Sequence, residues 1–148
     1  MRPDLDRFLE VATAHLMVDV APALDSGYAQ SNTMVLGLML GALREELERV
    51  AARRVEENCV LRGLFRDASG CVEDAALGQR LEAAAASEEP SLLVSDLERS
   101  NCALRALLIE LHAHVETLDS AEARRIEEAI WRELAASTER RRLSIGPF

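Results

Sequence analysis

Apolar residues recur along most of the chain at the three- and four-residue spacing of an amphipathic helix. The first such stripe starts at Leu5 and runs to Pro22, which predicts a helix over residues 4–20. A second pattern contains no proline and predicts one long helix over about 31–68. At 1.5 Å per residue a straight helix of this length spans on the order of 55 Å, so a kink is an alternative. The glycines that could introduce it are Gly37, Gly41 and Gly63.

Three shorter helices are expected after the long one, over residues 72–86, 91–117 and 119–137. Ser91 is a candidate N-cap for the second of them. For the third, Asp119 and Glu122 have the spacing of a capping box. The pattern therefore predicts an all-α fold, an antiparallel helical bundle of four to five helices.

The length and composition of the chain favour one domain followed by a short tail. A chain of 148 residues can bury a core of its own, and with 3% aromatic residues that core must consist mainly of aliphatic side chains. We expect the bundle to occupy residues 1–138. Residues 139–148 combine three arginines with Gly146 and Pro147 and show no helical period, so we expect a flexible tail there.

Charge and cysteine usage exclude several classes of function. The 17 cationic residues are all arginine, so no lysine nucleophile or phosphate-loop lysine is available. A net charge of −9 disfavours nucleic acid as a partner. The longest apolar stretch, Met34 to Leu43, is too short to cross a membrane. Three cysteines without paired spacing, together with a charged N-terminal segment, favour a cytoplasmic protein: Cys59, Cys71 and Cys102.

A histidine and carboxylate cluster is the single feature that suggests a metal. The cluster contains Glu110, His112, His114 and Glu116, and His15 is a further candidate ligand from the first predicted helix. On one helix His112 and His114 point to nearly opposite sides, so they cannot hold one ion together. No Glu-x-x-His occurs, which excludes the di-iron arrangement. We therefore expect no metal and no cofactor, and keep a mixed site in which His15 or Asp19 faces His114 as the alternative.

Motifs of nucleophilic catalysis and phosphate binding are missing from the sequence. No catalytic residue can be assigned, and a non-enzymatic role is favoured. Gly37 and Gly41 form a G-x-x-x-G pattern, which in a helical bundle indicates close approach of another helix.

Two asparagines lie on the apolar stripes of different predicted helices. The segment that begins Asn58-Cys59 recurs as Asn101-Cys102 at an offset of 43 residues, so a duplicated helical hairpin is conceivable. Buried amides need hydrogen-bond partners. Asn58 and Asn101 either form a paired core contact that sets helix register or lie at the edge of the stripe, bonded to water.

Residues 3–68 carry a wider resemblance through Pro3-Asp4-Leu5, Pro22, Leu43-Arg44-Glu45-Glu46 and Arg54 to Asn58. This part of the chain resembles small helical bacterial proteins of unknown function whose genes often lie beside acyl-CoA dehydrogenases and phosphotransferase-like kinases. The resemblance implies a link to acyl-CoA metabolism and offers no catalytic residue. The leading hypothesis is thus a non-catalytic accessory or interaction protein that forms a homodimer. The alternatives are a metal-binding bundle and a small-molecule or acyl-chain binding module with a groove near Met34 to Leu43.

Overall fold

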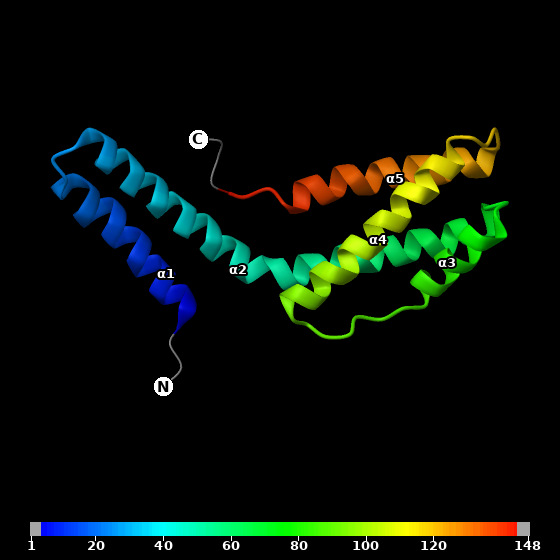
Figure 1. Ribbon diagram of the computed structural model, residues 1–148, viewed down its shortest axis with the longest axis horizontal. Coiled ribbons are helices and arrows are strands. Elements are labelled where there is room, and N and C mark those ends of the chain that lie inside the picture. Colours follow the sequence, from blue (N-terminus) through cyan, green and yellow to red (C-terminus); the bar gives the residue numbers. More distant parts are fainter. Residues whose placement is uncertain (1–3, 145–148) are drawn as a thin grey trace. The chain divides into compact units, whose positions relative to one another are not determined.

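The computed structural model describes residues 4–144, and these residues are almost entirely helical (Figure 1). Five α-helices are present in the described part, which contains no strand: α1 (Leu5–Ala14), α2 (Gly27–Ala68), α3 (Ala75–Ala85), α4 (Val94–Val115) and α5 (Ala121–Arg140). The all-α prediction and the single long helix are confirmed. None of the helices within residues 4–144 is both long and apolar enough to span a membrane.

The chain divides by its internal contacts into two compact units, which we describe separately. Of the described residues, unit 1 comprises 4–49 and 143–144, and unit 2 comprises 50–142. The long helix α2 contributes its first half to unit 1 and its second half to unit 2. The sequence predicts one domain over residues 1–138, whereas the contacts within the chain divide it into two units.

Unit 1 is a helical hairpin. Helix α1 continues as a π-helical segment, His15–Val20, and a short 3₁₀ turn, Ala21–Ala23, that contains Pro22. Proline cannot donate the backbone hydrogen bond of a helix interior, so the chain turns here as the sequence predicts. Helix α2 then begins at Gly27, about four residues earlier than expected, and the Ser26 hydroxyl accepts a hydrogen bond from the Ala29 amide at 3.4 Å.

Unit 2 holds the hydrophobic core. The second half of α2 packs with α3, α4 and α5, and α4 and α5 run antiparallel to one another (Figure 1). The largest buried apolar side chains come from all four helices: Leu61, Phe65, Leu81, Leu97, Leu111 and Ile130. As the scarcity of aromatic residues implies, Phe65 is the only aromatic ring among the buried core residues of the described chain.

Helix boundaries follow the predicted pattern closely, but two predicted caps are wrong. The N-cap of α4 is Leu93, whereas Ser91 accepts a hydrogen bond from the Leu93 amide just before the helix. The N-cap of α5 is Ser120, whose hydroxyl accepts from the Ala123 amide at 3.0 Å. Asp119, one residue earlier, instead pairs with Arg124.

The predicted tail begins later than residue 139. Helix α5 continues to Arg140, and the next residue, Arg141, bonds to the buried carboxylate of Glu57. Ser144 bonds to Glu45 through its amide and its hydroxyl. These contacts fix residues 140–144 in place. They join residues that are far apart in the sequence, so the local pattern of apolar residues cannot predict them. The rest of the predicted tail, 145–148, lies outside the described residues.

Candidate functional site

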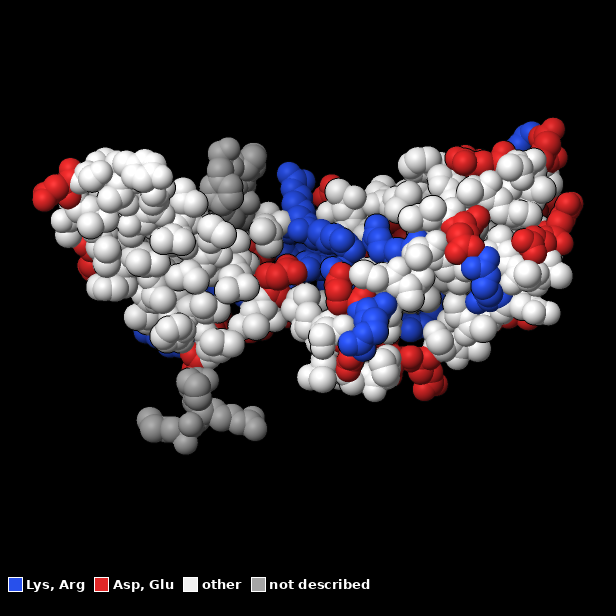
Figure 2. All heavy atoms as spheres, viewed as in Figure 1, with Lys and Arg blue, Asp and Glu red and all other residues white. Residues whose placement is uncertain are grey.

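The outer surface of unit 1 is rich in exposed apolar side chains. We define the hairpin face as the large apolar residues of unit 1 that are exposed: Leu5, Phe8, Val11, Val18, Tyr28, Met34, Val35, Leu36, Met39, Leu43 and Leu47. Exposed fractions reach 78% for Tyr28 and 69% for Val18, and Met39 is 60% exposed. Among the described residues of unit 1, Leu9 and Ala21 are the only buried apolar side chains. The surface over α1 and the first half of α2 is mostly uncharged in Figure 2.

The sequence of α2 explains why this surface carries so little charge. From Ser26 to Leu43 there is no Asp, Glu, Lys or Arg, although the helix is largely solvent-accessible over this stretch. Leu36, Met39, Leu43 and Leu47 follow one another at three- or four-residue steps and therefore share one side of α2. Large exposed apolar patches in folded proteins occur where the surface meets another protein, a membrane or a ligand.

Two contacts hold the hairpin together. A Cβ atom added to Gly37 would lie 2.4 Å from Cγ of Met17, so only glycine allows Met17 to pack against α2 here. The G-x-x-x-G pattern thus marks a close approach within the hairpin at Gly37. Nearer the start of α1, Arg44 pairs with Asp6 through Nε at 2.5 Å and a second nitrogen at 2.9 Å. The hydrogen bonds from Arg44 lower the pKa of Asp6.

A polar network fills the middle of unit 2 around Glu57, which is fully buried. Its carboxylate accepts hydrogen bonds from Arg54 at 2.8 Å, from Arg141 at 2.8 and 3.0 Å and from the Ser137 hydroxyl at 3.0 Å. Burial alone would raise the pKa of Glu57, but the hydrogen bonds from Arg141 and Ser137 and the two arginine charges outweigh it and lower the pKa to about 2. The network therefore holds an ionised carboxylate in the core.

The two asparagines belong to this network, because Asn101 donates a hydrogen bond from Nδ2 to the Glu57 carboxylate at 3.3 Å. Asn101 donates a hydrogen bond from Nδ2 to Oδ1 of Asn58 at 2.8 Å, and both side chains are buried. Asn58 in turn donates to Glu89 at 2.9 Å and to the Leu97 carbonyl at 3.3 Å. The amides therefore contact each other directly, across α2 and α4, and lie inside the core rather than at its edge.

The five metal candidates from the sequence do not gather in one place. His15 belongs to unit 1 and bonds to Asp19 at 2.9 Å. Glu110 pairs with Arg80 at 2.5 Å, which lowers the pKa of Glu110. His112 lies 3.5 Å from Glu116 in the last turn of α4, as the four-residue spacing predicts.

A further carboxylate, which sequence reasoning missed, joins that pair. Potential ligand atoms of His112, Glu116 and Glu127 all lie within 4.8 Å of one another. Glu127 comes from α5, the antiparallel neighbour of α4. The short connection between the two helices is the sequence signal that could have suggested this, because it brings the first turns of α5 beside the last turn of α4.

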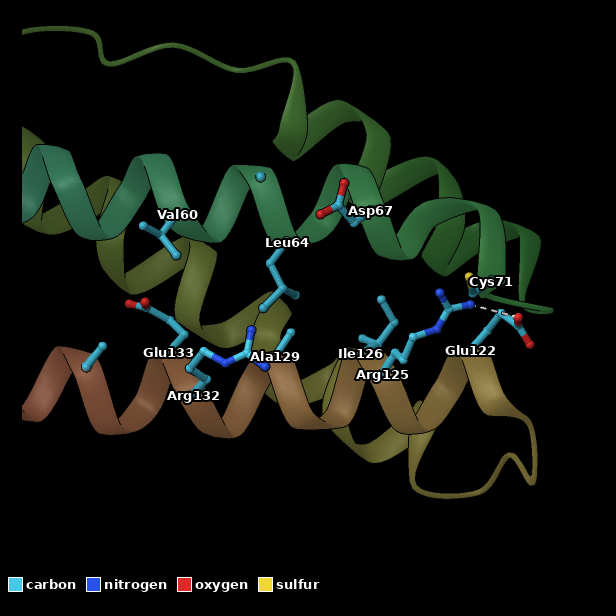
Figure 3. A pocket seen from close by; sticks show the side chains of 12 residues that line it. Val60, Leu64, Asp67, Cys71, Glu122, Arg125, Ile126, Ala129, Arg132 and Glu133 are labelled. Atoms are coloured by element: carbon cyan, nitrogen blue, oxygen red, sulfur yellow. Dashed lines mark hydrogen bonds and ion pairs between the residues drawn. The ribbon is translucent and has the colours of Figure 1, made fainter.

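A groove of about 670 Å³ lies in unit 2 between the second half of α2 and α5 (Figure 3). Leu64 and Ile126 point toward each other across it, and Arg125 at its rim pairs with Glu122 of the same helix. Cys71 is its one nucleophile of note, and no histidine lines the groove to activate the thiol. The lining therefore lacks an arrangement for nucleophilic catalysis.

Comparison of the chain with protein families, with curated proteins and with solved structures gives no match.

Proposed function

We propose that this protein is a non-catalytic interaction protein that forms a homodimer through the hairpin face. The observation that carries the proposal is the exposure of apolar side chains along α1 and the first half of α2. A hairpin of two helices cannot enclose a core, because each helix leaves its outer side uncovered. A partner that covers this side removes the apolar surface from water.

A second copy of the chain is the occupant that the charge pattern favours. Two copies with a net charge of −9 repel each other wherever their acidic surfaces meet. The stretch from Ser26 to Leu43 carries no charge and can face itself across a twofold axis without placing like charges together. Two hairpins that pair in this way complete a four-helix bundle.

Burial of apolar side chains is the driving force expected for such a dimer. Complete burial of a large apolar side chain contributes about 1.5–3 kcal/mol, so covering the exposed half of each contributes about 1 kcal/mol. The hairpin face has eleven of these side chains in each copy. Association costs about 4–15 kcal/mol in lost motion, so a stable dimer requires that most of these side chains lie in the interface.

The test is the subunit count of the purified protein, measured by sedimentation equilibrium and native mass spectrometry. We expect the wild-type protein to be a dimer at micromolar concentration. Met39→Glu places a like charge from each copy in the interface, and we expect dimerisation to weaken by about 100-fold, since such contacts cost several kcal/mol.

Ile109→Glu is the matched control, because Ile109 is 70% exposed and belongs to unit 2. This variant should remain dimeric, and circular dichroism should show unchanged helix content for both variants. A monomeric wild-type protein at high micromolar concentration, or an Ile109→Glu variant that dissociates as readily as Met39→Glu, contradicts the proposal.

An accessory role in cytoplasmic acyl-CoA metabolism is the second part of the proposal. It is supported by the resemblance of residues 3–68 to proteins encoded beside acyl-CoA dehydrogenases and by the three cysteines, none of which is in a disulfide. We expect purified protein to leave acyl-CoA thioesters unchanged. Hydrolysis or dehydrogenation that a single substitution abolishes would replace this role with an enzymatic one.

A further inference from the structure

The proposed interaction role does not involve the contact between His112 and Glu116 at the end of α4. His112 Nε2 lies 3.5 Å from a Glu116 carboxylate oxygen. That nitrogen is buried and has no hydrogen-bond partner among the described residues. A neutral imidazole nitrogen with a free lone pair repels a carboxylate oxygen, so either a proton on Nε2 or a cation between the two groups must relieve the contact.

The surroundings of His112 prepare it to bind a cation. Its ring packs edge-on against Trp131, with ring centroids 5.2 Å apart and planes at 85°. This contact from α5 restrains the imidazole, and its side chain is only 20% exposed. Glu127, on the same helix as Trp131, brings a second carboxylate to the same point. The three groups thus come from the C-terminal end of α4 and from α5, which pack together in unit 2.

The dimensions fit a small divalent ion after a modest adjustment. Bonds of about 2.0–2.2 Å from zinc to nitrogen and oxygen place neighbouring ligands roughly 3.5 Å apart. The three ligand atoms are at most 4.8 Å apart. The Glu116 side chain is 54% exposed, so it can rotate toward His112 and Glu127 and shorten the distances between the ligand atoms.

We propose that His112, Glu116 and Glu127 form a binding site for one divalent transition-metal ion of the zinc type. A neutral imidazole and two carboxylates balance the charge of such an ion and match its preference for nitrogen and oxygen ligands. Three protein ligands leave a fourth position for water. His114, two residues away on the other side of α4, and Glu110, which pairs with Arg80, are not part of the site.

The position of Trp131 supplies a direct readout, because it is the only tryptophan in the chain. Co²⁺ bound to His112 should quench Trp131 fluorescence. The experiment uses full-length protein without a histidine tag, treated with chelator and then titrated with Co²⁺ by fluorescence and with Zn²⁺ by calorimetry. We expect saturation at one ion per chain by both methods.

Variants separate this site from adventitious binding. His112→Phe keeps an aromatic ring against Trp131 and should lose stoichiometric binding, and Glu127→Gln should weaken it. His114→Ala is the matched control and should bind as the wild type does. The absence of a saturable site in the wild type, meaning that a proton on His112 relieves the contact, overturns the proposal. Equal loss in His114→Ala and His112→Phe does so as well.

Discussion

Glu57 is fully buried, and its pKa is lowered to about 2, so a charged carboxylate lies in the core of unit 2. Its carboxylate joins the second half of α2 to α5 through Ser137 and to Arg141 just beyond that helix. A charge in a core is tolerated only when hydrogen bonds and opposite charges replace the lost water. The network therefore stabilises the fold only when it is complete, because removing one member leaves buried polar groups without a partner.

Replacing the Glu57 carboxylate with an amide should destabilise the protein strongly. In Glu57→Gln, Arg54 and Arg141 lose their shared anion, and we expect the free energy of unfolding to fall by about 3 kcal/mol, as for other broken buried ion pairs. Urea unfolding at a fixed protein concentration measures this. Glu56→Gln is the control, since Glu56 is 60% exposed and 3.6 Å from Arg140, and it should change the free energy by less than about 0.5 kcal/mol.

The same carboxylate predicts a direction for the pH dependence of stability. The pKa of Glu57 is about 2 in the folded protein against 4.5 for a free glutamate, so the folded state favours the ionised form. Its stabilisation is complete above pH 4.5 and is lost as the pH falls toward 2. Wild-type protein should lose stability in this range more steeply than Glu57→Gln. Parallel pH profiles of the two proteins would show that Glu57 is not the group responsible.

Individual helices depend on how their first backbone amides are satisfied, and α5 offers a clear case. Asp119 has the spacing of a capping box, yet the Ser120 side chain forms the capping bond. Both residue types are good N-caps, so sequence preference alone does not select between neighbours. The backbone conformation that follows α4 decides which side chain meets the free amides.

Removing the observed cap should cost more than removing the expected one. We predict that Ser120→Ala lowers the free energy of unfolding by about 1 kcal/mol, because the Ala123 amide loses its acceptor. Asp119→Ala should cost less, since the Asp119 side chain is 91% exposed and its contact is a surface ion pair. Chemical unfolding of both variants tests this, and a larger loss for Asp119→Ala would contradict the assignment.

At the scale of the whole molecule, apolar residues are divided unevenly between the two units. Unit 2 encloses a core built by four helices, whereas unit 1 leaves most of its large apolar residues exposed. An association that covers the hairpin face links folding to subunit concentration. If the homodimer forms, the melting temperature should rise with protein concentration, because mass action stabilises the associated folded state.

This dependence is measurable by calorimetry over a hundredfold range of concentration. Met39→Glu should melt at a lower temperature than the wild type at every concentration, and its dependence on concentration should shift to higher concentrations, while Ile109→Glu should retain the wild-type dependence. A concentration-independent wild-type transition would contradict the homodimer. It would leave the metal site untouched, because His112, Glu116 and Glu127 all belong to unit 2.

Local order along the chain was readable from the sequence. The spacing of apolar residues and Pro22 predicted all five α-helices to within a few residues, because backbone hydrogen bonds and the 3.6-residue period act between near neighbours. The four-residue pairing of His112 with Glu116 followed from the same geometry. The lack of lysine excluded lysine chemistry without any structure.

Tertiary packing alone decided which of these local features meet. It placed Glu127 beside His112, Arg141 on Glu57 and Asn58 against Asn101, all between residues far apart in the sequence. It also left the stripe of Leu36, Met39 and Leu43 uncovered, although its periodicity resembles that of a core helix. Such outcomes depend on how helices cross and on where connections turn, and a periodic pattern states only which side of a helix is apolar, not what covers it.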